Sequence, residues 1–396
     1  DINDVAGLAT TQGSPLFKDH VPDKDEHVVA RIRAAGAIVV GKTNVPELGF
    51  GAITTNPLFG TTSNPFDLAT TCGASSGGTA VALAAGLVPL ATGSDFAGSL
   101  RTPASFCAVT GFRPSPGLVA NEKRAFGWSP FNVEGPMGRE AKDARLLLGV
   151  MMSRAVFDPL AAPDQPGLAG PPTFVDLSRL RVAISEDLGF APMDDRVRAS
   201  FREKAAAFGG CFREVAAAAP DLGDADRTFL ALRALELVHA YGATYERDPK
   251  LIAPNVRVDL ERALGLSARE VARAIGEQTK AYRRAQRFFE RFDLLITPAA
   301  SVVPFGHDVP YPSHINGKSL ANYLHWEAIS YGVTLITNPA VVIPCGLGPT
   351  GLPFGIQIVG RAREDSALAD IAVTLESLFE CHERLRRPVP RLDHLR

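Results

Sequence analysis

Two serine–glycine clusters lie close together in the first third of the sequence. The first, 73-GASSGG-78, leads into an alanine-rich segment that should be helical, and the second is 93-GSDFAGSLRTPAS-105. A serine hydroxyl can attack a carbonyl when a base accepts its proton, and small residues let consecutive backbone N–H groups converge on an oxyanion. Ser99 follows Ser75 by 24 residues, enough for one helix and one strand to bring the two loops together. The presence of two such loops favours a catalytic site over a turn with no functional role.

The residues of the first cluster, taken alone, also allow other interpretations. Gly73 to Gly78 has the G-x-x-x-x-G frame of a phosphate loop, but Thr79 occupies the position of the lysine that binds the terminal phosphates. Gly73 to Gly77 also fits the G-x-S-x-G nucleophile elbow, which needs a buried strand before it and a catalytic histidine, and neither is evident. A glycine-rich loop that caps a helix is the simplest structural alternative.

The segments that must position these loops alternate between strand and helix patterns. Because such alternation is typical of layered α/β folds, the sequence predicts this fold class. We expect a helix over 25–36, one through Val197, Phe201 and Phe208 that ends at Gly209–Gly210, and one from 365 onward. Strands are expected at 37–40, 180–185, 293–298, 339–344 and 354–360.

The strand pattern disappears between 222 and 292. Ser267 and Glu270 have capping-box spacing, and the helix they begin carries Val271, Ile275, Tyr282 and Phe289 as its apolar positions. We interpret 222–292 as a helical insertion on the substrate side of the molecule.

Composition excludes several function classes. The formal net charge of −2 over 396 residues gives no attraction to nucleic acid or to an anionic membrane. No apolar run is long enough for a membrane span, and five scattered cysteines favour a reducing compartment, so we expect a cytoplasmic protein. Metal-ligand spacing is absent, and we expect no cofactor and no metal.

The long run 41-GKTNVPELGFG-51 through 110-TGFRP-114, which contains both serine clusters, resembles the amidase signature family of serine hydrolases, which cleave carboxamides. The resemblance extends to 4-DVAGLATTQGS-14, 134-EGPMGR-139, 293-DLLITP-298 and 338-NPAVVIPCG-346. It implies one large α/β/α layered domain over 1–396, N-terminally incomplete, with a mixed central β-sheet.

The resemblance also implies roles for individual residues. Ser99 matches the nucleophile, and Ser75 matches a bridging serine that follows a cis peptide bond, here Ala74–Ser75. The third catalytic member of the family is a lysine, which activates Ser99 through Ser75. The oxyanion hole matches the N–H groups of Phe96, Ala97, Gly98 and Ser99, and the supporting positions match Ser76, Asp95 and Arg101.

The catalytic lysine of the family immediately precedes the aspartate that corresponds to Asp1, so its position lies just upstream of this sequence. We expect the natural chain to carry it there. The alternative is a chain without this lysine, which would be catalytically inactive. Lys42 could be proposed as a substitute base, but we interpret it as a structural lysine at the end of the 37–41 strand.

The expected function is hydrolysis of a small-molecule amide to a carboxylate and ammonia or an amine, by a protein that could form a homodimer. Two alternatives remain: the glutaminase component of an aminoacyl-tRNA amidotransferase, and an inactive binding protein with the amidase fold. Aromatic loop residues are candidate substrate contacts, although packing roles are equally compatible with them: Phe126, Trp128, Phe131, Tyr323 and Trp326.

Overall fold

A mixed eight-stranded sheet forms the centre of the molecule in the computed structural model, which describes residues 1–393. Neighbouring strands are antiparallel from β5 to β10, and β10, β8 and β9 are parallel. The predicted α/β class with a mixed central sheet is therefore confirmed. In spatial order the strands are β5 (Leu90–Asp95), β7 (Val133–Gly138), β6 (Thr110–Arg113), β13 (Ala340–Leu347), β14 (Pro353–Val359), β10 (Leu294–Pro298), β8 (Arg181–Ile184) and β9 (Glu214–Ala217).

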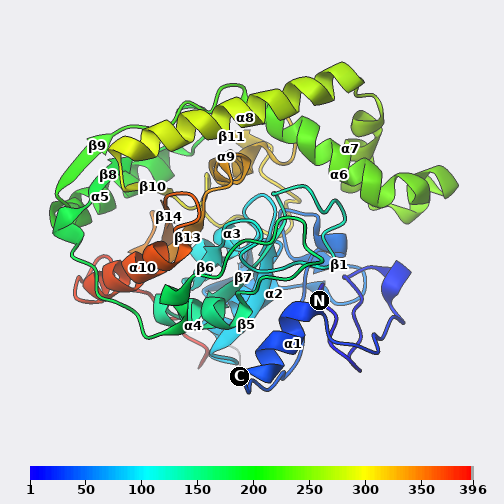
Figure 1. The fold of residues 1–396 in the computed structure, drawn as a ribbon, viewed down its shortest axis with the longest axis horizontal. Coiled ribbons are helices and arrows are strands. Elements are labelled where there is room, and N and C mark those ends of the chain that lie inside the picture. Colours follow the sequence, from blue (N-terminus) through cyan, green and yellow to red (C-terminus); the bar gives the residue numbers. More distant parts are fainter. Residues whose placement is uncertain (394–396) are drawn as a thin grey trace.

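Helices cover both faces of this sheet (Figure 1). On β6, Thr110 donates its hydroxyl hydrogen to Glu376 of α10 (3.2 Å), whereas a Cβ on Gly111 would lie 3.0 Å from Ala104 of α3. Successive strand residues point to opposite faces, so α3 and α10 lie on opposite sides of the sheet. The covering helices are α2 (Gly77–Ala84), α3 (Arg101–Phe106), α4 (Ala141–Met151), α5 (Asp195–Phe208), α9 (Ala328–Ile336) and α10 (Asp365–Glu380).

Three further helices form the segment expected to be a helical insertion: α6 (Ala225–Arg247), α7 (Pro254–Leu264) and α8 (Ala268–Arg291). They lie along the upper edge of the view in Figure 1, and both α6 and α8 pack against α9. The capping box of Ser267 and Glu270 is present.

The expected apolar face of α8 was partly wrong. Ile275 and Tyr282 are 50% and 37% exposed, and the buried stripe consists of Ala274, Ala281, Ala285 and Phe289. The small side chains of this stripe let neighbouring helices approach closely. A search for large apolar residues does not detect a stripe made mostly of alanines.

The predicted strand at 37–40 is not formed. Helix α1 (His27–Ala34) is followed by Gly36, whose φ of +92° suits glycine. Residues 37–40 then form no strand pairing with any described residue. Ile38 and Val40 are 87% and 76% exposed. Alternating apolar residues form a strand only where a neighbouring strand supplies backbone partners.

Outside the central sheet, residues 1–393 also form three short two-stranded sheets. They are formed by β1 (Thr55–Asn56) with β2 (Gly60–Thr61), β3 (Ser63–Asn64) with β4 (Asp67–Thr71), and β11 (His314–Ile315) with β12 (Lys318–Ser319). Within residues 1–393, none of the helices combines the length and the apolar character that crossing a membrane requires.

Candidate active site

The first serine cluster forms a tightly packed turn between β4 and α2. The Ala74–Ser75 peptide bond is cis, as the resemblance implies. Ser75 and Ser76 are both buried. Glycine is required directly after them, because a Cβ on Gly77 would lie 2.2 Å from Oγ1 of Thr54 and one on Gly78 would lie 2.5 Å from a backbone nitrogen. Close packing of neighbouring residues against both glycines therefore holds this turn in one conformation.

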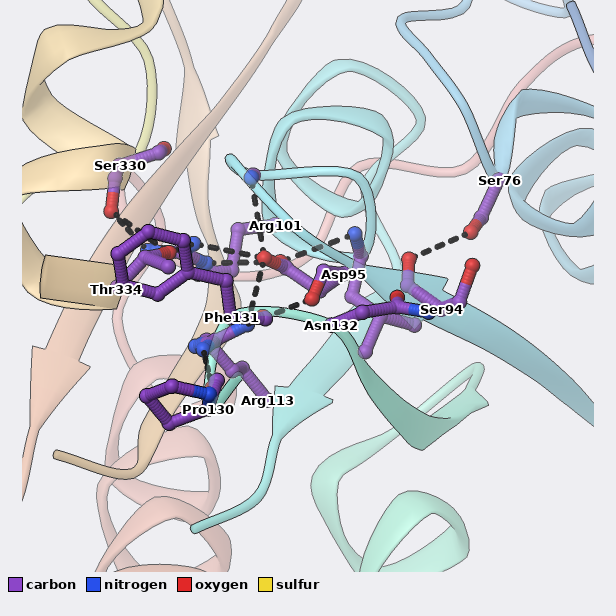
Figure 2. Close-up of polar contacts among 12 residues, drawn as sticks. Ser76, Ser94, Asp95, Arg101, Arg113, Pro130, Phe131, Asn132, Ser330 and Thr334 are labelled. Carbon is purple, nitrogen blue, oxygen red and sulfur yellow. Dashed lines mark hydrogen bonds and ion pairs between the residues drawn. The ribbon is translucent and has the colours of Figure 1, made fainter. Parts of the chain in front are cut away.

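The structure brings the two serine clusters together. The backbone N–H of Ser76 donates to the carbonyl oxygen of Ser99 (3.2 Å), and the Ser76 hydroxyl donates to the carbonyl of Ser94 on β5 (3.3 Å; Figure 2). Ser99 lies in the turn between β5 and α3, so one end of the sheet positions both loops. Ser76 thus joins the two loops through hydrogen bonds.

Asp95 organises the turn that carries Ser99. Its carboxylate accepts hydrogen bonds from the N–H groups of Gly98 (3.0 Å) and Leu100 (3.2 Å). It also pairs with Arg101 at 2.8 and 2.9 Å and with Arg113 at 3.1 Å (Figure 2). Burial alone would raise the pKa of Asp95, but these charges and hydrogen bonds outweigh it and lower the pKa to about 2. Asp95 is therefore ionised at neutral pH.

Arg101 connects this turn to the distant C-terminal half of the chain. Its guanidinium donates to the carbonyl of Ser330 (2.7 Å) and the hydroxyl of Thr334 (3.0 Å) on α9, and to Oε1 of Gln357 on β14 (2.7 Å). The side chains of Arg101 and Asp95 are fully buried. A buried ion pair with all these partners holds the turn in one conformation.

The turn presents backbone N–H groups that could stabilise an oxyanion. In the described residues, the N–H groups of Phe96, Ala97 and Ser99 donate to no protein atom, whereas that of Gly98 is bonded to Asp95. Three of the four donors expected from the resemblance are therefore free, and the fourth helps to shape the turn.

Gly98 lies against α9 in a conformation that favours glycine. Its φ is +133°, and a Cβ there would lie 2.8 Å from Cβ and 2.9 Å from Oγ of Ser330. The Ser330 hydroxyl is buried and has no hydrogen-bond partner within residues 1–393. Ser330 had no recognisable signal in the sequence, because it contacts the turn only through the tertiary fold.

An aromatic cluster connects the Ser99 turn to the helical insertion. The ring of Phe96 lies 5.6 Å from that of Phe131 and 5.8 Å from that of Phe229 on α6, measured between centroids. Phe229 in turn stacks on Tyr331 of α9 at 4.5 Å. Phe229 and Tyr331 were missed in the sequence, because apolar helical residues there are indistinguishable from ordinary core.

The aromatic residues expected to contact substrate lie in different surroundings. Phe126 and Trp128 are 36% and 72% exposed in the loop that leads to the buried Phe131. The Tyr323 hydroxyl accepts a hydrogen bond from Arg233 of α6 (2.6 Å). Trp326 is only 1% exposed and packs against Phe305, so it offers no surface to a substrate in this structure.

Two glutamates, the buried Glu327 and the half-buried Glu236, were not found from the sequence. Burial, together with the nearby carboxylate of Asp95, raises the pKa of Glu327 to about 8. Burial also raises the pKa of Glu236 on α6 to about 7, and its carboxyl group is hydrogen-bonded to the Ser129 hydroxyl. Both can therefore carry a proton near neutral pH.

Lys42 is bound to the first loop of the chain. Its ammonium group contacts Oδ1 of Asp1 (2.7 Å), the carbonyl of Ala9 (3.0 Å) and the hydroxyl of Thr10 (2.6 Å). Burial lowers the pKa of Lys42 to about 8. Because an ammonium has three donors and all are used, this geometry favours a structural role, although the strand that it was expected to end is not formed.

Comparison with known proteins gives consistent matches over nearly the whole chain. A family model described as Amidase matches residues 1–369. An acylamidase of Rhodococcus erythropolis is 31% identical over 385 residues, covering 96% of this chain and 80% of that protein. A glutamyl-tRNA(Gln) amidotransferase component of Roseiflexus sp. (strain RS-1) is 29% identical over 416 residues, covering 97% and 82%.

Solved structures show the same fold. A bacterial aryl acylamidase of the amidase signature enzymes superposes with a TM-score of 0.84 at 24% identity, covering 95% of this chain and 80% of that chain. A 6-aminohexanoate cyclic dimer hydrolase complexed with substrate gives a TM-score of 0.81 at 26% identity, with coverages of 98% and 85%.

Proposed function

Because the chain belongs to the amidase signature family and is an amide-hydrolysing enzyme, we propose that it cleaves its substrate through an acyl-enzyme on Ser99. The observation that carries this proposal is the junction of the two serine loops through Ser76 and Ser99, beside three unpaired N–H groups. No metal or cofactor is required for this chemistry.

In the proposed mechanism, the Ser99 hydroxyl attacks the amide carbon and passes its proton to Ser75. Ser75 gives its own proton to a neutral lysine, and the N–H groups of Phe96, Ala97 and Ser99 hold the oxyanion. Loss of one such donor typically costs about 3–4 kcal/mol of barrier. The relay then protonates the leaving nitrogen, the C–N bond breaks, and water hydrolyses the Ser99 ester to release the acid.

We propose that the lysine immediately precedes Asp1, as the resemblance implies. The amino nitrogen of Asp1 donates to the carbonyl of Thr43 (2.8 Å), and the Thr43 hydroxyl contacts that of Thr79 (2.8 Å) on α2. Helix α2 begins two residues after Ser75. A residue before Asp1 would therefore enter near the Ser75 turn. Intact mass and N-terminal sequencing of the protein from its natural source test this assignment.

The aromatic cluster around Phe96 supports an apolar acyl or aryl group as the substrate portion next to Ser99. The relatives named acylamidase and aryl acylamidase agree with this class. The test is hydrolysis of a panel of amides by the full natural chain and by its Ser99→Ala and Ser75→Ala variants. We expect Ser99→Ala to abolish release of the acid and Ser75→Ala to lose most of the rate. Near-normal turnover by Ser99→Ala would refute the mechanism.

A glutaminase role within a tRNA-dependent amidotransferase is the second candidate, supported by the relatives named as glutamyl-tRNA(Gln) amidotransferase components. Such a component releases ammonia from glutamine and functions with partner proteins. Glutaminase assays, and gel filtration with and without a cell lysate, separate this role from that of an independent amidase or a homodimer.

A further inference from the structure

A cavity of about 370 Å³ lies between helices α6, α7 and α8. Its size falls within the range of small-molecule sites in proteins. None of the residues around it belongs to either serine loop. The side chains in its walls that carry the argument are Arg233, Ala234, Asp259, Arg262 and Arg273.

Small apolar side chains create the interior of the cavity. Ala231 and Ala234 of α6, Ala263 of α7 and Ala274 of α8 are each less than 9% exposed and meet around it. Where larger residues would fill the space between three helices, alanines leave it open. A 150 Å³ apolar cavity is enough to admit benzene, so this one has room for an aromatic ring or a short alkyl chain.

Two guanidinium groups share one carboxylate at the α7 wall of the cavity, whose walls as a whole carry five acidic and four basic side chains. The carboxylate of Asp259 is buried and shared by two guanidinium groups, those of Arg233 and Arg262. Arg262 contacts it at 3.4 Å and is 53% exposed, so most of its five N–H donors are available. Arg273 on α8 forms no ion pair in the part of the chain that the structure describes.

In the described residues, four of the five acidic side chains that line the cavity have ionic or hydrogen-bond partners, and the fifth, Asp224, directly precedes α6. Glu270 pairs with Arg227 and Glu277 with Lys280, and Asp226 is bound by Tyr331 and His325. Asp226 precedes Arg233 by two turns of α6, which is about 10 Å along the helix. The cavity therefore combines an apolar interior with an arginine-lined opening.

We propose that this cavity is a second ligand site, separate from Ser99, that binds a small carboxylic acid with an aromatic or alkyl body. The carboxylate would contact Arg262 and Arg273, and the body would lie among the alanines. Carboxylates pair well with guanidinium groups. The choice of ligand rests on the proposed function, since amide hydrolysis of an apolar acyl group releases an acid of this class.

Helix α6 is common to both sites. It forms a cavity wall with Ala231 and Ala234, and Phe229 of the same helix packs against Phe96 in the Ser99 turn. A ligand in the cavity therefore contacts the helix that supports the catalytic turn, and a product acid bound there is placed to influence turnover.

The test is calorimetric titration of the full natural chain with benzoate, and with benzyl alcohol as the neutral probe. We expect saturable benzoate binding that Arg262→Gln weakens roughly 10- to 100-fold, because a charge-assisted contact is lost. Ala234→Leu should abolish it by filling the cavity. Both substitutions keep good helix formers, and thermal unfolding verifies that the variants are folded. Benzyl alcohol should bind more weakly than benzoate.

Arg269→Gln is the matched control, because Arg269 is an exposed arginine of α8 outside the cavity walls, and it should leave benzoate binding unchanged. Absence of saturable benzoate binding at millimolar concentrations would overturn the proposal. Binding that Arg262→Gln and Ala234→Leu leave intact would also overturn it, since the acid would then lie elsewhere. These titrations need no turnover, so loss of amide hydrolysis counts against the proposed function alone.

Discussion

Replacing Gly98 with alanine tests how the Ser99 turn is held. The new Cβ would lie 2.8 and 2.9 Å from Cβ and Oγ of Ser330, closer than van der Waals contact allows, and φ is +133°. A non-glycine residue in such a conformation costs of the order of 1–3 kcal/mol. Because α9 is buried throughout, the turn must move instead of the helix.

Movement of this turn should affect catalysis more than stability. It carries Ser99 and the N–H groups of Phe96 and Ala97, and the loss of one oxyanion donor lowers kcat by roughly 100- to 1,000-fold. We therefore expect Gly98→Ala to lower kcat for amide hydrolysis by at least roughly 100- to 1,000-fold. The variant should unfold at a temperature only several degrees lower than the natural chain. Acid release and thermal unfolding measure the two effects.

Ser330→Gly separates the steric contact from the backbone strain. It removes the two atoms that the new Cβ would meet, at a helix cost of about 1 kcal/mol. In a double-mutant cycle on the activation free energy of amide hydrolysis, Ser330→Gly should offset part of the loss caused by Gly98→Ala, with a coupling of about 0.5–3 kcal/mol. Gly36→Ala is the matched control, since Gly36 also has positive φ but nothing within 4 Å of a Cβ. Wild-type turnover by Gly98→Ala, or strict additivity in the cycle, would refute the reasoning.

Three further predictions concern the Asp95 ion pairs, the buried carboxyl group of Glu376 and the aromatic residue Phe229. Asp95→Asn should destabilise the fold by about 3–5 kcal/mol in chemical unfolding, because it leaves Arg101 and Arg113 buried without their carboxylate; a stability loss below about 1 kcal/mol would contradict this. Burial raises the pKa of Glu376 from 4.5 to about 7, so the folded state keeps a proton that the unfolded chain releases. The contribution of Glu376 to the free energy of unfolding should therefore fall as pH rises from about 4.5 through 7, by roughly 3 kcal/mol at most. Glu376→Gln should flatten that part of the curve of unfolding free energy against pH. Phe229→Ala should lose about 3–5 kcal/mol of stability through its cavity and raise KM for aromatic amides more than for acetamide, and an equal change for both substrates would exclude a role in specificity.

Local patterns predicted the elements that carry their own signals. The strand at 293–298 appears as β10 and the helix from Asp365 as α10, because each has a continuous apolar run or stripe. The Ala74–Ser75 cis bond also follows from the motif, which marked Asp95 and Arg101 as supporting positions without indicating that they pair.

Tertiary contacts were beyond the reach of these patterns. The segment 37–40 has strand composition, but no described neighbour pairs with it. Ser330 and Phe229 join the site through α9 and α6, and nothing in their local sequence marks them. For Trp326 the sequence left both a substrate contact and a packing role open, because the local pattern does not show which way the side chain points, and in the structure it is buried.

The contacts of Arg101 have a consequence for the order in which the protein is made. Gln357 lies 256 residues after Arg101, and Ser330 lies 229 residues after it. At translation rates of about 5–20 residues per second, roughly 13–50 s pass between synthesis of Arg101 and of Gln357. Until Ser330 is made, the guanidinium has none of these partners, and the last of them, Gln357, follows 27 residues later. The Ser99 turn therefore reaches its final geometry only when nearly the entire chain has emerged, and a nascent chain that stops earlier is not expected to hydrolyse amides.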